Sequence, residues 1–154
     1  MLLANHFQNA YVTADIDAAV AAMVEQFALT RAPRQIDARQ MFTTPDGTAE
    51  GTMRMAFIQV GHLQYELIQP VSGNVRLYAD FVVPDRPLTL HHVAMRTDDI
   101  EAVRAESEAH GRPVVLEGAA QQGLRFMYVD ARRTLGHYLE YVQAPEEFWG
   151  AKKA

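Results

Sequence analysis

Apolar and polar positions follow the same order in two separate parts of the chain. The segment QNAYVTADIDAA, residues 8–19, aligns with HVAMRTDDIEAV, residues 92–103, so that Asp15 meets Asp99 and Ile16 meets Ile100. In each copy a strand-like stretch leads through a threonine and acidic residues into an alanine-rich stretch that favours a helix. Asp15 and Asp99 are suited to cap the N-terminus of that helix. Each copy therefore predicts a strand followed by a helix.

The part of the chain that follows each helix repeats as well. RMAFIQVGHLQYELIQP, residues 54–70, resembles RFMYVDARRTLGHYLEYVQAP, residues 125–145, with a longer turn in the second copy. Both segments are typical of β-hairpins, one turning at 60–62 and the other at 130–136. A further strand is expected before each hairpin, near 40–44 and near 114–117. The repeat thus predicts an α+β fold made of two βαβββ modules.

The repeat also predicts the domain organisation. We expect the first module over residues 5–71, a linker over 72–88 and the second module over 89–145, together forming one compact domain. The linker contains Pro84 and Pro87. A chain of 154 residues, of which 49% are hydrophobic, can bury a core of this kind without covalent staples.

Composition and charge exclude some classes of binding partner and favour others. The formal net charge is −5 and no Lys/Arg-rich run is present, which argues against nucleic acid and favours a small-molecule substrate. No apolar run approaches the roughly 20 residues that span a bilayer, and the N-terminus lacks signal-peptide features, so we expect no membrane association and a cytoplasmic location. The sequence has no cysteine, so a metal would need histidine, carboxylate or amide ligands.

Four side chains at matched positions of the two modules are the candidates for chemistry. Gln8 aligns with His92, and Glu66 aligns with Glu140. Both glutamates lie in apolar strands, where an unpaired buried charge costs roughly several kcal/mol. One shared divalent cation would pair both. Each glutamate alone is also compatible with the solvent face of an edge strand, and Gln8 with a hydrogen-bonded polar residue.

Other residues that could carry chemistry favour structural roles. His91 is adjacent to His92 along a strand and therefore faces the other way. The stripe that includes Phe126 and Tyr128 favours a core over a cofactor pocket. Surface or packing roles are also expected for three further histidines, His62, His110 and His137. Three arginines are generic candidates for binding a substrate carboxylate: Arg54, Arg96 and Arg125.

The order and spacing of these motifs resemble the vicinal oxygen chelate superfamily, which includes glyoxalase I, methylmalonyl-CoA epimerase, extradiol dioxygenases and bleomycin-resistance proteins. The resemblance runs from about residue 5 to residue 145. It rests on the ligand position that precedes each helix-starting aspartate and on the stretches AFIQVGHLQYELIQPVSG, LHHVAMRTDDIEAV and LGHYLEYVQ. It implies two βαβββ modules whose mixed sheets form a cupped half-barrel around one divalent metal, and a homodimer.

The family's four metal-ligand positions correspond to Gln8, Glu66, His92 and Glu140. His6 shares a strand face with Gln8 and is the alternative first ligand. The resemblance leaves the metal open among Zn, Ni, Co, Mn and Fe. The ligand set is similar to zinc-using glyoxalase I, whereas NVRLYADFV and LHHVAMRTDDIEAV are similar to epimerase-like members.

Three functions are compatible with this resemblance. The leading hypothesis is a lyase or isomerase that moves a proton next to a metal-bound carbonyl, with Glu140 preferred over Glu66 as the base. An Fe(II) dioxygenase is an alternative, although its facial triad needs two histidines and the matched set offers one unless His6 serves. A metal-free protein that binds a small molecule such as an antibiotic is the other alternative. That class usually lacks the two hairpin carboxylates.

Overall fold

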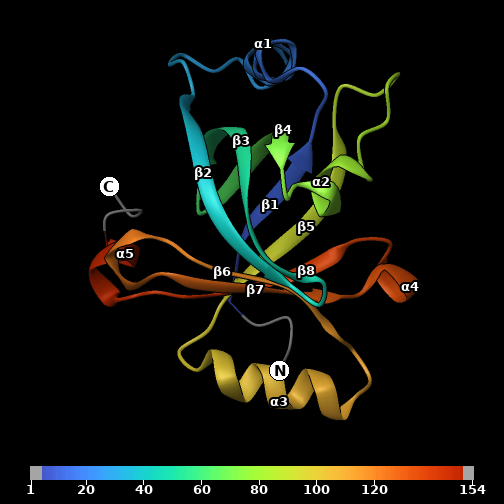
Figure 1. Ribbon diagram of the computed structural model, residues 1–154. Helices are drawn as coiled ribbons and strands as arrows, with labels where there is room; N and C mark the ends of the chain where they lie inside the picture. The colour runs from blue at the N-terminus through green and yellow to red at the C-terminus, as the bar shows by residue number, and fades with distance from the viewer. Residues whose placement is uncertain (1–4, 151–154) are drawn as a thin grey trace. The chain divides into compact units, whose positions relative to one another are not determined.

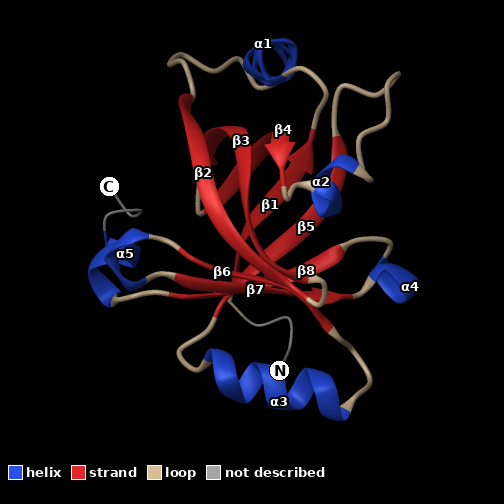
Figure 2. Ribbon diagram, viewed as in Figure 1, coloured by secondary structure: helices blue, strands red, loops and turns tan. Residues whose placement is uncertain are grey.

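The computed structural model describes residues 5–150 (Figure 1). In chain order the elements are β1 (His6–Val12), α1 (Ile16–Gln26), β2 (Arg34–Thr44), β3 (Gly47–Val60), β4 (Leu63–Gly73), α2 (Arg76–Ala79), β5 (Thr89–Arg96), α3 (Ile100–Ala109), β6 (Val114–Ala119), η1 (Gln121–Gly123), β7 (Arg125–Asp130), α4 (Arg132–Leu135), β8 (Tyr138–Gln143) and α5 (Glu146–Gly150). Figure 2 shows the strands in red and the helices in blue. The order β1-α1-β2-β3-β4 recurs as β5-α3-β6-β7-β8, so the predicted pair of βαβββ modules is confirmed.

The chain divides into two compact units whose limits differ from those of the modules. The described part of one unit consists of residues 5–7, 40–49 and 92–150, and the other unit consists of residues 8–39 and 50–91. The tip of the β2–β3 hairpin therefore belongs to the unit that contains the second module.

Helices α1 and α3 begin at the predicted cap residues. The Asp15 carboxylate accepts hydrogen bonds from the backbone N–H groups of Asp17 and Ala18. The Asp99 carboxylate accepts one from Ala102. These bonds satisfy donors that the first helical turn leaves unpaired. The predicted helix starts are confirmed in both copies.

The repeat extends to a contact between each helix and the last strand of its module. The backbone N–H of Ile16 donates to Oε1 of Gln69 at 3.0 Å. At the equivalent place the N–H of Ile100 donates to Oε1 of Gln143 at 3.1 Å. Each glutamine thus fixes the start of its helix against the end of β4 or β8.

The sheet of the first module carries α1 on one face. Strand β1 runs parallel to β4, and β4 is antiparallel to β3. Alternation along these strands puts one set of apolar side chains under the helix. This cluster consists of Ile16, Ala19, Met23, Ala56, Ile58 and Leu67.

The sheet of the second module carries α3 in the same way. Strand β5 runs parallel to β8, β8 is antiparallel to β7, and β7 is antiparallel to β6. The end of β2 adds to β6 through the pairs Phe42–Gly118 and Thr43–Glu117. The cluster beneath α3 consists of Met95, Ile100, Met127, Val129, Ala131, Leu139 and Tyr141.

Three segments differ in detail from the sequence expectation. The strand expected near 40–44 begins earlier, at Arg34. The turn expected at 130–136 contains the short helix α4, and the linker contains α2. None of the helices described within residues 5–150 is long and apolar enough to cross a membrane.

Candidate functional site

The second module buries a histidine and a glutamate on the face of its sheet opposite α3. We call this the helix-free face; it carries Phe126, Tyr128, Tyr138, Glu140 and His92. In the parallel pair of β5 and β8, His92 is in register with Tyr138 and Ala94 with Glu140. His92 is fully buried, and Glu140 is 7% exposed. Their closest atoms, Nε2 of His92 and Oε2 of Glu140, lie 3.1 Å apart.

A series of aromatic rings begins beside His92. The His92 ring lies 4.7 Å from that of Tyr128, and Tyr128 stacks on Tyr138 at 6.3 Å between centroids. Phe126 lies 6.1 Å from Tyr128. A carboxylate in such apolar surroundings needs a cation or a hydrogen-bond donor beside it, because its desolvation is otherwise uncompensated. Nε2 of His92 is the nitrogen that lies beside the Glu140 carboxylate.

A charged pair lies next to the tyrosines at the turn between β7 and β8. The Arg132 guanidinium lies 4.9 Å from the ring centroid of Tyr138, a cation–π contact. Its Nε and Nη2 donate to the two carboxylate oxygens of Asp130 at 2.9 and 2.6 Å. These bonds hold the pKa of Asp130 below its ordinary value. Half of the Arg132 side chain is exposed, so it can meet a ligand from solvent.

The first module buries the matched pair of residues. Ala10 on β1 is in register with Glu66 on β4, as Ala94 is with Glu140. Gln8 is 5% exposed and Glu66 is 6% exposed. The Gln8 amide donates to Oε1 of Gln64 at 2.7 Å. Both predicted site glutamates are therefore buried, which rules out the solvent-face alternative for each.

The alternative first ligand, His6, differs from Gln8 in burial. His6 begins β1 and is exposed, whereas Gln8 is buried on the same strand. Strand alternation gives the two residues the same face, but a metal site shielded from water favours the buried one. Burial thus supports Gln8 as the first ligand.

The donor chemistry of the second-module pair fits a divalent metal. Two ligand atoms about 2.1 Å from one ion lie roughly 3.0–3.4 Å apart in octahedral or tetrahedral geometry, and the His92–Glu140 distance of 3.1 Å falls in that range. Within residues 5–150, no three His, Cys, Asp or Glu side chains gather closely enough to hold a metal ion. The fit therefore rests on the His92–Glu140 pair alone.

The three arginines proposed as carboxylate binders each pair with a carboxylate of this chain. Arg54 pairs with Asp17, Arg96 with Glu146 and Arg125 with Glu101. Sequence reasoning did not consider Arg132. The sequence gives little indication of Arg132, because its position over Tyr138 depends on helix α4. The hairpin pattern did not predict this helix.

His91 has the packing role expected of it. It is fully buried, stacks on Tyr78 at 4.7 Å and places Nε2 3.1 Å from the carbonyl oxygen of Leu77. Phe126 and Tyr128 are also buried, as the core interpretation predicted. The sequence pattern did not show that these two rings border the histidine–glutamate pair.

Paired βαβββ modules that each bury two polar residues on matched strands define the class, a glyoxalase- and bleomycin-resistance-like fold. The family described as Glyoxalase/Bleomycin resistance protein/Dioxygenase superfamily matches residues 7–128, and the chain belongs to this superfamily. The match ends before β8, the strand that carries Glu140. A search of curated proteins finds no match.

Solved structures show the same fold at low sequence identity. Methylmalonyl-CoA epimerase from Mycobacterium tuberculosis is 16% identical, with a TM-score of 0.61, over 97% of this chain and 93% of that one. A hypothetical protein from Bacillus halodurans C-125 is 16% identical, with a TM-score of 0.63, over 92% and 94%. A Streptomyces coelicolor methylmalonyl-CoA epimerase variant in complex with 2-nitronate-propionyl-CoA is 16% identical, with a TM-score of 0.57, over 91% and 94%.

Proposed function

We propose that the protein is a divalent-metal-dependent lyase or isomerase that moves a proton on the carbon next to a substrate carbonyl. The observation that carries this proposal is the His92–Glu140 pair, buried at 3.1 Å on the helix-free face. Membership of the superfamily supports an enzyme of the vicinal oxygen chelate kind. Because solved neighbours include methylmalonyl-CoA epimerases, a CoA thioester is the first substrate class to test.

The proposed metal ligands are Gln8, Glu66, His92 and Glu140. Their support is the matched register of the two modules and the burial of all four side chains. Imidazole nitrogen, carboxylate and amide oxygen together suit Zn, Ni, Co, Mn or Fe. The chemistry that such an ion supplies when bound is polarisation of the substrate carbonyl.

Glu140 is the proposed general base. A carboxylate oxygen of Glu140 takes the proton from the α-carbon, so that the C–H bond breaks and an O–H bond forms. Delivery of a proton to the opposite face of that carbon by a second acid completes an epimerisation. The buried rings of Tyr128 and Tyr138 lie on the same face as the pair and limit the access of water to it. Glu66 is the second candidate base because its position is matched.

Glu140→Gln tests the base directly. The substitution keeps size and an oxygen ligand but removes the charge and the ability to take a proton. Exchange of an α-proton for deuterium in a trial thioester or ketone, followed by NMR, should fall about 100-fold or more while metal remains bound. Glu147→Gln, an exposed position in α5, is the matched control and should exchange like the parent. Exchange at the parental rate in metal-loaded Glu140→Gln would transfer the role to Glu66.

A second candidate function is metal-free binding of a planar aromatic molecule. The observation that favours it is a series of neighbouring aromatic rings in the unit that contains the second module. The rings belong to Phe42, Phe126, Tyr128 and Tyr138. A binding protein of this kind would take up an aromatic ligand in calorimetry without metal and would catalyse no α-proton exchange. Homodimer formation and a cytoplasmic location stay predictions under either function.

A further inference from the structure

Arg132, in the turn between β7 and β8, lies over a ring of the helix-free face. Its guanidinium is 4.9 Å from the ring centroid of Tyr138. Tyr138 is in register with His92 on the neighbouring strand β5, and neighbouring strands are about 4.8 Å apart. The guanidinium of Arg132 therefore lies on the same face of the sheet as the buried His92–Glu140 pair.

Asp130 fixes the orientation of this guanidinium. It accepts hydrogen bonds from Nε and Nη2 of Arg132, at 2.9 and 2.6 Å, and so binds one edge of the planar group. The other edge, formed by Nη1 and the second N–H of Nη2, is directed away from Asp130. Two parallel N–H groups at that edge match two oxygens of a carboxylate or phosphate. Because half of the side chain is exposed, such an anion can reach it.

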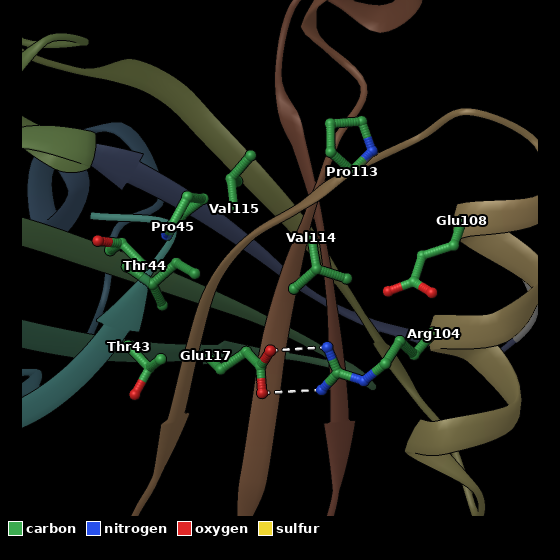
Figure 3. Close-up of a pocket in the computed structure, with 10 residues that line it drawn as sticks. Thr43, Thr44, Pro45, Arg104, Glu108, Pro113, Val114, Val115 and Glu117 are labelled. Carbon is green, nitrogen blue, oxygen red and sulfur yellow. Dashed lines mark hydrogen bonds and ion pairs between the residues drawn. The ribbon is translucent and has the colours of Figure 1, made fainter. Parts of the chain in front are cut away.

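Arg104 on α3 shows a contrasting arrangement, in a pocket beside β6 (Figure 3). Its Nη1 and Nη2 donate to the two oxygens of Glu117 at 2.6 and 2.8 Å, drawn as dashed lines, and its Nε donates to Glu101 at 3.0 Å. Both edges of that guanidinium therefore bind carboxylates of the chain itself. Its side chain is 24% exposed, compared with 50% for Arg132. Arg132 is the better suited of the two to bind an anion from solvent.

We propose that Arg132 determines substrate specificity by binding a carboxylate or phosphate of the substrate at a distance from the reacting carbon. This inference rests on the proposed function, which places the reacting carbon beside Glu140. The anion accepts hydrogen bonds from Nη1 and Nη2, while Asp130 and the ring of Tyr138 hold the guanidinium in place. The substrate class is a thioester with a further anionic group, either on its acyl chain or on its thiol part.

Two pairs of thioesters distinguish these sources of the anion, with calorimetry on the full chain as the readout. The first pair is S-glutaryl-N-acetylcysteamine and its methyl ester, which differ in one acyl carboxylate. The second pair is that methyl ester carried by coenzyme A or by N-acetylcysteamine, which differ in the phosphates. In one of the pairs the parent should bind the anionic member about 10-fold more tightly, because charge-assisted hydrogen bonds to a guanidinium have an effect of this size.

Variants of the turn test whether Arg132 causes that preference. Arg132→Gln should abolish it, and Arg132→Lys should retain only part of it, because lysine keeps the charge without the two-pronged edge. Arg133→Gln is the matched control and should keep the preference, since Arg133 is an exposed arginine of the same turn and makes no ion pair within residues 5–150. A preference unchanged in Arg132→Gln, lost equally in Arg133→Gln, or absent from the parent in both pairs would overturn the proposal.

Exchange of the α-proton in the same thioesters keeps this inference apart from the proposed function. A preference that depends on Arg132, without exchange in the metal-loaded parent, would refute the proton-transfer function and support the anion site. Exchange in the parent, without any such preference, would refute the anion site and support the proton-transfer function.

Discussion

At the scale of single residues, burial decides how the acidic side chains of this chain behave. Glu66 and Glu140 occupy matched strand positions and are both buried, whereas the edge-strand interpretation would expose them. The sequence could match these two positions by repetition. It could not predict their burial, because burial depends on residues of other strands, such as Tyr128, which is in register with Glu140.

Asp130 gives a prediction for stability against pH. Hydrogen bonds from Arg132 lower the folded-state pKa of Asp130 below its unfolded value of about 3.9. A lowered pKa contributes stability above the unfolded pKa, and this contribution is lost as pH falls through the folded pKa. We expect Asp130→Asn to be less stable than the parent by under about 1 kcal/mol at pH about 6, because Arg132 is half exposed.

Urea unfolding of both proteins from pH about 6 to about 3 measures this difference. The gap between parent and Asp130→Asn should narrow toward the acidic end, as the pH falls below the unfolded pKa of Asp130 toward its lower folded pKa. A gap that stays constant over this range would show that Arg132 does not stabilise the charged form of Asp130.

At the scale of elements, features that depend on residues close in the sequence could be predicted. Features that depend on residues far apart in the sequence could not. Asp15 and Asp99 cap their helices as predicted, because a cap depends on neighbours within a few residues. The helix α4 was missed. Its four residues lie in the longer turn of the second hairpin and end at Gly136, whose φ of 79° is left-handed. The position of Arg132 over Tyr138 follows from this turn.

The cap of α3 can be tested against its neighbour. Asp99→Ala removes the acceptor for the Ala102 N–H and should lower the free energy of unfolding by about 1 kcal/mol. Asp98→Ala is the matched control, since the side chain of Asp98 is 91% exposed and makes only a long ion pair with Arg96. Urea unfolding compares the two variants. Equal losses would mean that charge, and not the cap, stabilises the start of α3.

Two glycines separate backbone strain from steric overlap in the β3–β4 hairpin. Gly61 and Gly73 both have positive φ, 61° and 76°. A Cβ on Gly61 meets nothing within 4 Å, whereas a Cβ on Gly73 would overlap the carbonyl oxygen of Glu50, which accepts the Asn74 N–H. Gly61→Ala should cost about 1 kcal/mol from its φ alone, and Gly73→Ala at least about 1 kcal/mol more.

Thermal and urea unfolding of the two alanine variants measure that difference. Both substitutions add the same methyl group and reduce unfolded-state freedom alike, so the extra loss in Gly73→Ala reports the overlap with Glu50. Equal stability of the two variants would mean that the chain at Glu50 moves aside without cost.

At the scale of the whole molecule, duplication accounts for what the sequence could predict about function. The repeat aligned Gln8 with His92 and Glu66 with Glu140, and the structure gives each pair the same relation between neighbouring parallel strands. The sequence also identified the superfamily, because order and spacing of motifs are carried over the whole chain. The sequence did not reveal the substrate, because the motifs that carry the resemblance are shared by members of the superfamily that act on different molecules.

Metal binding is the property of the whole chain that the proposed ligand set predicts. If Gln8, Glu66, His92 and Glu140 share one ion, protein purified without a histidine tag should contain about one divalent ion per chain by elemental analysis. A chelator should then lower Tm, because ligand binding to the native state at 100 times Kd stabilises it by about 2.7 kcal/mol.

Variants at two proposed ligands and at His6 make that measurement more specific. His92→Ala and Gln8→Leu should reduce metal content and the chelator-induced change in Tm, since each removes a proposed ligand. His6→Ala, on the same strand as Gln8 but exposed, is the control and should bind metal like the parent. Loss of metal in His6→Ala with retention in Gln8→Leu would make His6 the first ligand. A parent protein without metal, and with a Tm indifferent to chelator, would favour the metal-free binding function.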